Sequence, residues 1–242
     1  MIQAPLEAPP RWLPRGAAAE AFTIWALCFV AIVITYLTLT PYAKLVATAG
    51  FLYLPLWAMR KRGEDYRDYG VSLRAWMQDL KLFAILFGII LPVFTLAYFG
   101  FSRLLPHLPP ELARLLAPSQ YLTSPPFHLR LPARFPEWVV DQLFVVALPE
   151  EFFYRGYLQT RLRDAWPEGR TVFGVRLGKA FWVTAILFAL GHLAIFQVWR
   201  LGVFFPALLF GWMREKTGSV LGAALLHACC NLLVIVLEAS FS

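Results

Sequence analysis

Charged side chains are scarce in this sequence, and their scarcity excludes an ordinary soluble domain. Asp, Glu, Lys and Arg make up 15% of the 242 residues, whereas a soluble globular domain carries about 25%. Hydrophobic side chains make up 59% of the chain and aromatic ones 16%, and the mean hydropathy is +0.60. Because the apolar residues gather in long runs, the composition predicts a membrane protein with several spans.

Cysteine is nearly absent, which excludes a scaffold built on disulfides. The three cysteines, Cys28, Cys229 and Cys230, all lie inside apolar stretches. The adjacent pair would sit on one helix and point in different directions, so no disulfide framework is implied. We interpret all three as small apolar side chains.

Two common hydrolase motifs are also missing, and the sequence has no internal repeat. It contains neither the H-E-x-x-H pattern of zinc proteases nor the G-x-S-x-G pattern of serine hydrolases. Both absences count against these mechanisms for any hydrolytic site in the chain.

Long apolar runs predict the fold class. A transmembrane helix needs about 20 apolar residues. Such runs lie near Ala21–Leu39, Tyr42–Met59, Leu80–Phe101, Trp138–Leu158, Ala180–Val198 and Ser219–Leu237. A shorter apolar run, Leu201–Met213, contains Pro206 and is either a thin span or a re-entrant helix buried by its neighbours. We therefore expect an all-α, polytopic transmembrane helix bundle with about seven membrane segments, one of them short or re-entrant.

The distribution of basic residues predicts the orientation of the bundle. The ranges 60–81 and 155–179 each hold six Lys or Arg residues, and the ranges 11–15 and 214–216 hold two each. These ranges lie on the side of the membrane that the N-terminus occupies if all seven segments cross. The positive-inside rule then places the N-terminus in the cytoplasm of a multi-pass protein of the cell inner membrane. This clustering at span ends, rather than nucleic-acid binding, accounts for the net charge of +7.

The runs divide the chain into four regions. Residues 1–19 form a cytoplasmic tail, and residues 20–101 hold the N-terminal transmembrane helices. Residues 102–136 form an extracytoplasmic loop rich in Pro and Leu, with a short interfacial helix expected around Pro110–Leu116. Residues 137–242 form the transmembrane core that carries the polar residues discussed next.

Three of the predicted spans carry polar side chains that a bilayer-spanning segment should not have. They are Glu150-Glu151-x-x-x-Arg155, Phe188-x-x-x-His192 and His227-x-x-x-Asn231. An ionisable group at membrane depth costs several kcal/mol unless it is paired or lines a cavity, so each one is a functional hypothesis by default. Three sets in one small protein predict a shared polar pocket.

The two adjacent glutamates differ in their local partners. Consecutive helix positions are about 100° apart, so Glu150 and Glu151 should not face the same pocket. Glu151 lies four residues before Arg155, the favourable order for a helical ion pair, whereas Glu150 has no charged neighbour at that spacing. Glu150 is therefore the candidate general base. Pro149 lacks an N–H and should bend the helix just before the pair.

The depth of these groups favours one common site. At ~1.5 Å per residue, Glu150 lies ~16 Å from Arg161, His192 lies ~18 Å from the basic end of its helix, and His227 lies ~12 Å from Ser219. Taken singly, the glutamates could mark the wet end of a helix, and each histidine could join two helices by a hydrogen bond. Coincident depth favours a shared site instead.

The residue types suit the hydrolysis of a carbonyl compound by water. A buried Glu and a His can act as general bases. His227 and Asn231 are four residues apart, point the same way and can donate to an oxyanion. The same set of side chains could also hold a metal ion, since two His and one Glu bind zinc in many hydrolases. Phe188 shares a face with His192 and should pack against it.

The three motifs, in this order on successive helices, resemble the CPBP family of intramembrane proteases, which includes the CAAX-processing endopeptidases. The segment from Phe210-Gly211-Trp212 to His227-Ala-Cys-Cys-Asn231 is similar to the closing motif of that family. The resemblance covers roughly residues 139–237. The bias towards Ala, Arg, Leu and Pro indicates a bacterial protein, and the compact size is similar to that of the myxosortases, which process sorting signals of surface proteins.

The resemblance implies a role for each site residue. Glu150 and His192 would activate the attacking water, and His227 and Asn231 would stabilise the oxyanion. Glu151, Arg155 and Phe188 would support the site, and the reaction would need no metal or other cofactor. The implied partners are a membrane-anchored protein or peptide substrate and the lipid bilayer.

Two other functions use the same residues. In a non-catalytic scaffold or immunity protein, the polar cluster would hold helices together or bind a partner. In a small proton-coupled transporter, the cluster would relay protons. Replacing Glu150 with Gln separates the three, because only a protease would lose the ability to cut a peptide while keeping its fold.

Overall fold

The computed structural model describes residues 16–116 and 126–241, and most of them are helical. The α-helices are α1 (Ala17–Thr38), α2 (Ala43–Arg62), α3 (Trp76–Leu104), α4 (Pro110–Leu116), α5 (Phe135–Val140), α6 (Leu148–Glu151), α7 (Gln159–Ala165), α8 (Lys179–Gly191), α9 (Phe204–Thr217) and α10 (Leu221–Ser240). Two π-helical segments, η5 (Asp141–Ala147) and η6 (Phe152–Leu158), join α5, α6 and α7 into one rod. The 3-10 turns are η1 (Thr40–Tyr42), η2 (Leu73–Ala75), η3 (Leu105–His107), η7 (His192–Ile195) and η8 (Val198–Val203).

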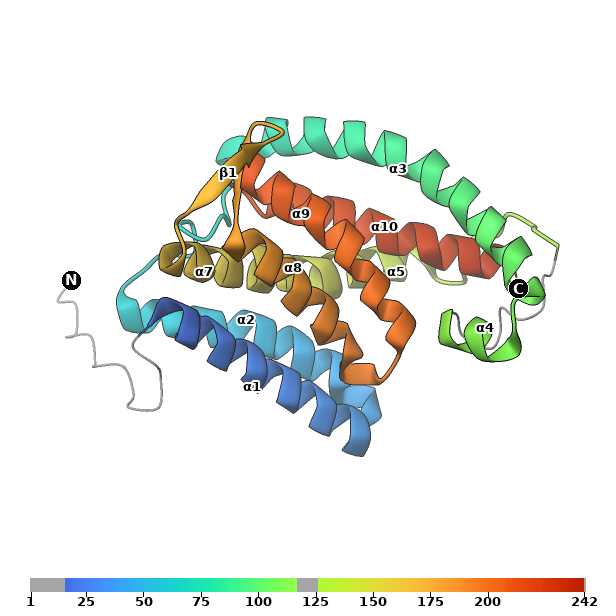
Figure 1. The fold of residues 1–242 in the computed structure, drawn as a ribbon, viewed down its shortest axis with the longest axis horizontal. Helices are drawn as coiled ribbons and strands as arrows, with labels where there is room; N and C mark the ends of the chain where they lie inside the picture. Colours follow the sequence, from blue (N-terminus) through green and yellow to red (C-terminus); the bar gives the residue numbers. More distant parts are fainter. Residues whose placement is uncertain (1–15, 117–125, 242) are drawn as a thin grey trace.

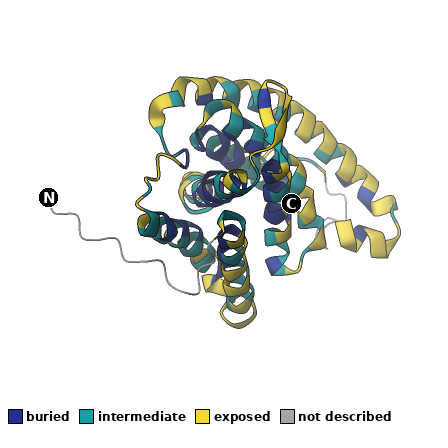
Figure 2. Ribbon diagram, turned by 60° about the vertical axis from the view of Figure 1, so that its left-hand side comes forward, coloured by how far each residue is buried: buried dark blue, intermediate teal, exposed yellow. Residues whose placement is uncertain are grey.

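The long helices run roughly side by side, with α3 on one flank and α1 and α2 on the other (Figure 1). The α10 helix packs against α3, η5 and α9, while α1 packs against α2 and α7. Buried residues gather on the helices between the two flanks, and the outer face of α3 is exposed along its length (Figure 2). The expected all-α bundle is therefore confirmed, and its interior is formed largely by the segment from 135 to 241.

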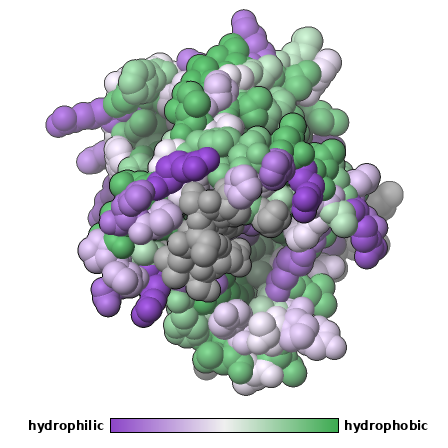
Figure 3. Space-filling view, turned by 90° about the vertical axis from the view of Figure 1, so that its right-hand side faces the viewer, coloured by the Kyte–Doolittle hydropathy of each residue, from purple (hydrophilic) through white to green (hydrophobic). Residues whose placement is uncertain are grey.

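Three helices in the described ranges are long and apolar enough to cross a bilayer: 17–38, 73–107 and 221–240. In the most apolar 18-residue stretch of the segment 73–107, which contains α3, no residue is buried inside the protein. Large apolar side chains such as Ile89 and Leu96 are exposed on this helix. Seen from the end that carries α4, hydrophilic side chains lie at the sides and middle of the molecule, and hydrophobic ones gather over its upper part (Figure 3). Such a surface is suited to lipid, so the protein is a membrane protein.

The remaining predicted segments form helices that are shorter or less apolar than these three. The α2 helix ends in Arg60-Lys61-Arg62, and α8 stops at Gly191, seven residues before the expected end at Val198. At Phe196 the backbone turns into the left-handed region, with φ 58°, so the chain cannot continue as a helix there. The number of seven membrane segments remains a prediction.

The rod from 135 to 165 departs from a regular α-helix on both sides of the glutamate pair. Pro149 sits near the start of the four-residue helix α6, and the backbone is π-helical before it in η5 and after it in η6. Such π-helical segments often occur at functional sites, and the bend expected at Pro149 stays a prediction.

The α8 and α9 helices form an antiparallel pair. The α8 helix starts at Lys179, the chain turns between residues 192 and 203, and α9 returns to Thr217, where Gly218 at φ 73° ends it. The predicted segment Leu201–Met213 thus comprises the end of η8 and most of α9. At ~1.5 Å per residue the 14 residues of α9 span ~21 Å, which agrees with a thin segment.

A β-hairpin, which the sequence did not lead us to expect, precedes α8. Strands β1 (Gly169–Val172) and β2 (Val175–Gly178) pair antiparallel, and the hairpin crosses the ends of the helices at the basic end of the molecule (Figure 1). Its two-residue turn has both φ values positive, at Phe173 and Gly174, which matches the twist of a tight hairpin.

The region between α3 and α5 contains a short helix at Pro110–Leu116, where the sequence predicted one; its interfacial location stays a prediction. The α3 helix extends three residues beyond Phe101, the end of its predicted span. Residues 117–125 of the predicted loop and residues 1–15 of the predicted tail lie outside the described residues.

A buried carboxylate joins three helices at the basic end of the bundle. Glu20 of α1 is 4% exposed and accepts hydrogen bonds from Arg62 of α2, from Tyr157 at 2.6 Å and from Arg161 of α7 at 3.1 Å. A buried charge is tolerated only with such partners. Glu20 therefore anchors the N-terminal helices to the rod that carries the glutamate pair.

Arg62 extends this network towards the loop after α2. It donates to Glu64 at 2.7 Å and to Tyr69 at 2.9 Å, and Tyr69 in turn donates to Glu64. Burial, together with the hydrogen bond to Glu64, raises the pKa of Tyr69, so this phenol stays protonated and donates over the whole physiological range.

The Glu20→Gln substitution should lower the free energy of unfolding by about 3 kcal/mol, because it leaves two arginines next to a neutral amide in a buried site. SDS-induced unfolding of the purified protein in mixed micelles measures this loss. The matched control is Glu137→Gln, whose carboxylate forms an exposed pair with Arg134 and should contribute less than about 1 kcal/mol. Equal losses in the two variants would contradict the anchoring role of Glu20.

Candidate active site

A buried ion pair lies at the centre of the polar cluster. Arg155 donates from Nη1 to Oε1 of Glu151 at 3.0 Å, and the two side chains are 1% and 0% exposed. The second terminal nitrogen of Arg155 donates to the backbone carbonyl of Ala207 on α9, at 3.2 Å. The helical pairing predicted from the four-residue spacing is confirmed, and it also connects the rod to α9.

Two aromatic rings lie close to this guanidinium. Its central carbon lies 4.2 Å from the ring centre of Phe188 and 5.3 Å from that of Phe210. A cation over an aromatic face gains about 2 kcal/mol when water is excluded. The rings therefore help Arg155 to remain in an apolar interior.

The imidazole of His227 lies between the two glutamates. Its Nδ1 is 2.8 Å from Oε1 of Glu151, and its Nε2 is 3.9 Å from Oε2 of Glu150. Because a carboxylate accepts, Nδ1 carries the proton, and Nε2 points towards Glu150. The expectation that consecutive glutamates could not serve one pocket is wrong. A single imidazole with two nitrogens on opposite edges reaches both carboxylates.

Glu150 differs from Glu151 in its surroundings. Its side chain is 18% exposed, and Oε2 has no hydrogen-bond partner among the described residues. Glu151 is fully buried and has both Arg155 and His227 on Oε1, while its Oε2, like that of Glu150, has no hydrogen-bond partner among the described residues. The asymmetry predicted from the sequence is present, with one carboxylate neutralised and the other left available.

His192 is held in place by its own helix. Its Nδ1 donates to the backbone carbonyl of Phe188 at 2.9 Å, which leaves Nε2 as an acceptor, and its ring packs against that of Phe188 at 4.7 Å. The predicted contact between these two side chains is confirmed. His192 also lies within electrostatic reach of Glu150. Gly191 permits this arrangement, because a side chain there would collide with the hydroxyl of Tyr154.

Asn231 lies one turn further along α10 than His227 and has a partner that the sequence analysis missed. Its amide nitrogen donates to Oε1 of Gln142 at 2.9 Å, and Gln142 is buried in η5. A polar residue eight positions before Glu150, in an apolar segment, was a detectable signal. Asp141 beside it pairs instead with Lys44 of α2, at 2.6 Å.

Phe210 was quoted only as part of a motif, yet it contributes directly to the site. Its ring stacks on the imidazole of His227, with ring centres 4.9 Å apart and planes at 15°. Phe188 contacts the same imidazole edge-on at 5.9 Å. Together the two rings fix the plane of His227, and no contact of this kind can be read from sequence spacing.

The structure brings six of the seven predicted residues into mutual contact: Glu150, Glu151, Arg155, Phe188, His192 and His227. Asn231 lies beside them with its amide turned to Gln142. Within residues 16–116 and 126–241, no group of three or more His, Cys, Asp or Glu side chains is arranged to hold a metal ion.

Comparison with known proteins identifies the family of this segment. Residues 133–233 match the family model described as type II CAAX prenyl endopeptidase Rce1-like. The matched range includes every residue of the cluster, together with Gln142 and Phe210. This segment is therefore similar to the CAAX prenyl endopeptidases, and the resemblance predicted from the motifs is confirmed for residues 133–233. Neither the curated proteins nor the solved structures include a match to the chain.

The two glutamates should respond differently to amidation. Glu151→Gln leaves the fully buried Arg155 without a counter-charge and should cost about 3–5 kcal/mol of unfolding free energy. Glu150→Gln removes no ion pair shorter than 3.9 Å and should change stability by less than about 1 kcal/mol. Unfolding in mixed micelles compares the two variants. A larger loss for Glu150→Gln would reverse our assignment of which carboxylate is structural.

Proposed function

We propose that the protein is an intramembrane endopeptidase that hydrolyses a peptide bond of a membrane-associated protein, using water activated by Glu150 and His192. The observation that carries this proposal is the contrast between the two carboxylates. Glu151 is fully buried and neutralised by Arg155, while Glu150 is partly exposed, forms no ion pair shorter than 3.9 Å and lies beside two imidazoles. The family of the matched segment supports a peptidase.

In the first step, Glu150 takes a proton from a water molecule as the water oxygen attacks the carbonyl carbon of the substrate. His192 assists by accepting a hydrogen bond from the same water through Nε2, since Nδ1 is already committed to the carbonyl of Phe188. The product of this step is a tetrahedral intermediate with a negative oxygen.

Donors on α10 stabilise this oxygen in the proposed mechanism. The amide nitrogen of Asn231 has two N–H groups, and only one of them is used by Gln142. His227, when doubly protonated, donates through Nε2 while Nδ1 remains bonded to Glu151. The intermediate then collapses as the C–N bond breaks, and the proton held by Glu150 passes to the leaving amine.

Glu151, Arg155 and Phe188 act as positioning residues in this scheme. Glu151 fixes His227 through Nδ1, Arg155 fixes Glu151, and Phe188 packs against both histidines. The protein's own side chains supply every proton transfer, so the proposed reaction uses no metal and no other cofactor. We propose that the enzyme works as a multi-pass protein of the cell inner membrane.

Glu150→Gln should abolish proteolysis, with a loss of at least about 10³-fold, while the protein accumulates normally. Each variant is expressed in a strain that lacks the wild-type gene, and the termini of membrane proteins are mapped by mass spectrometry. A new terminus found with wild type, and with the exposed-site control Glu137→Gln, should be missing with Glu150→Gln. Identical termini in all three strains would refute the protease.

Asn231→Ala should lower kcat by roughly 10²-fold with little change in KM, because a donor to the oxyanion acts mainly in the transition state. Gln142→Ala should cause a smaller loss, since Gln142 acts through Asn231. Both are measured with a peptide that spans the bond found in the preceding experiment. An unchanged kcat for Asn231→Ala would remove it from the mechanism.

A further inference from the structure

The catalytic cluster is closed on the side that faces the basic end of the bundle. Following Glu151 along the rod, the side chains of Arg155, Tyr157, Leu158 and Leu162 are at most 1% exposed and fill the interior. The buried Gln159 on the same stretch is hydrogen-bonded to Glu215 of α9. Because these side chains are packed, the partial exposure of Glu150 indicates access from another direction.

A cavity adjoins the cluster on its other side. We name it the α3–α10 groove, and it has a volume of about 540 Å³ between α3, η8, α9 and α10. Phe210 and Asn231 of the active site line its inner end. The groove is therefore continuous with the proposed oxyanion site.

The lining of the groove indicates what it would bind. Apolar side chains such as Ile90, Phe94 and Trp199 form most of it, with polar groups contributed by Arg200 and Asn231. A largely apolar pocket with a few placed polar groups is typical of a site that binds an apolar ligand in one orientation. For a peptidase, that ligand is an apolar peptide segment.

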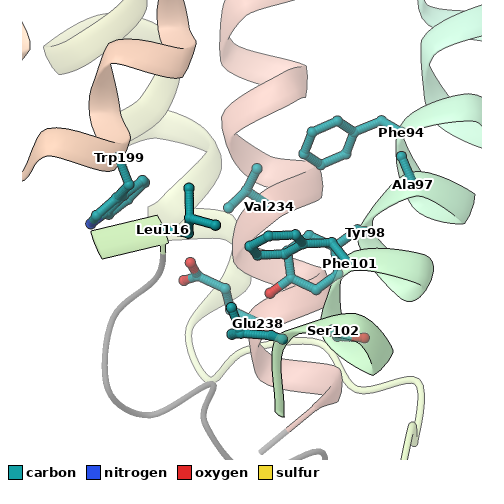
Figure 4. A pocket seen from close by; sticks show the side chains of 10 residues that line it. Phe94, Ala97, Tyr98, Phe101, Ser102, Leu116, Trp199, Val234 and Glu238 are labelled. Atoms are coloured by element: carbon teal, nitrogen blue, oxygen red, sulfur yellow. The ribbon is translucent and has the colours of Figure 1, made fainter. Parts of the chain in front are cut away.

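A second cavity of about 320 Å³ continues the groove away from the cluster. The two cavities share Phe94, Trp199 and Val234 in their walls. Figure 4 shows the Glu238 carboxylate among the aromatic side chains of α3 and Leu116 of α4. Glu238 lies near the end of α10, so the path runs from the active site towards the α4 end of the molecule.

This path leads away from the basic residues. Asn231 and Glu238 lie ~15 and ~26 Å along α10 from its start at Leu221, at 1.5 Å per residue. The basic ranges 60–81, 161–179 and 214–216 lie at the opposite end, where α10 starts and α2, α7 and α9 finish. Arg155 is left out of these basic ranges, because it is buried in an ion pair and its charge does not bear on the orientation of the protein in the membrane.

We infer that the active site is reached from the extracytoplasmic side of the membrane, and that the α3–α10 groove receives an apolar segment of the substrate there. The basic end faces the cytoplasm by the positive-inside rule, and the groove and the cavity that continues it extend towards the other end. The role of the groove rests on the proposed function. The reaction that supplies the substrate is then a translocation, because the scissile segment must first reach the outer face.

Gly202 offers a probe of this geometry. It lines the groove, and a Cβ added there meets no atom within 4 Å. In a background with Cys28, Cys229 and Cys230 replaced by Ala, Gly202→Cys should react with a membrane-impermeant thiosulfonate added outside intact spheroplasts. Arg67→Cys, exposed at the basic end, should react only in inside-out vesicles.

The labelling result does not depend on activity. Reaction of Gly202→Cys from the same side as Arg67→Cys, or from neither side, overturns the inferred access route. This holds whether or not Glu150→Gln abolishes proteolysis, so failure of the route and failure of the proposed function are distinguishable.

A bulky side chain in the α3–α10 groove tests whether the substrate occupies it. Gly202→Phe should reduce cleavage at least 10-fold while the protein accumulates normally. The matched control is Gly88→Phe, on the exposed face of α3, where a Cβ also meets no atom within 4 Å, and it should leave cleavage unchanged. Unchanged cleavage with Gly202→Phe would show that the substrate does not pass through the groove.

Discussion

One buried salt bridge, between Glu151 and Arg155, determines how the rest of the active site is arranged. It neutralises Glu151, the fully buried one of two adjacent carboxylates, while the partly exposed Glu150 forms no ion pair shorter than 3.9 Å. Glu151 accepts a hydrogen bond from Nδ1 of His227 on α10, and Arg155 donates one to the backbone carbonyl of Ala207 on α9. Three elements that are far apart in the sequence are thereby held to one ion pair. Removing either partner would leave a charge in an interior that has no water to solvate it.

Two aromatic rings pack against the ion pair and the two histidines. Phe188 contacts Arg155, His192 and His227, and Phe210 contacts Arg155 and His227 from the other side. Rings have few rotatable bonds, so they hold an imidazole plane at a small cost in entropy. The site is therefore rigid where the proposed chemistry needs fixed distances. Its free space lies on the side of Glu150, Asn231 and the α3–α10 groove.

The sequence predicted those features that depend on spacing within one helix. Glu151 and Arg155 pair as their four-residue separation requires, Phe188 packs on His192, and Pro110–Leu116 forms a short helix. Features that depend on contacts between helices could not be predicted from the sequence. Gln142 meets Asn231 across 89 positions, and His227 reaches both glutamates because of its position on another helix. The early end of α8 and the β-hairpin follow from local backbone turns at Phe196, Phe173 and Gly174.

The π-helical segments place extra residues in the rod on both sides of the glutamate pair. A π-helix closes i→i+5 hydrogen bonds instead of i→i+4, so η5 and η6 each place more residues in a turn than an α-helix does. Deleting one residue from η5 would let that turn close as regular α-helix, with Gln142 keeping roughly its direction relative to the glutamate pair. In a regular α-helix the same deletion would rotate the two by about 100°. The rod can therefore lose one residue at η5 with Gln142 and Glu150 still facing the same site.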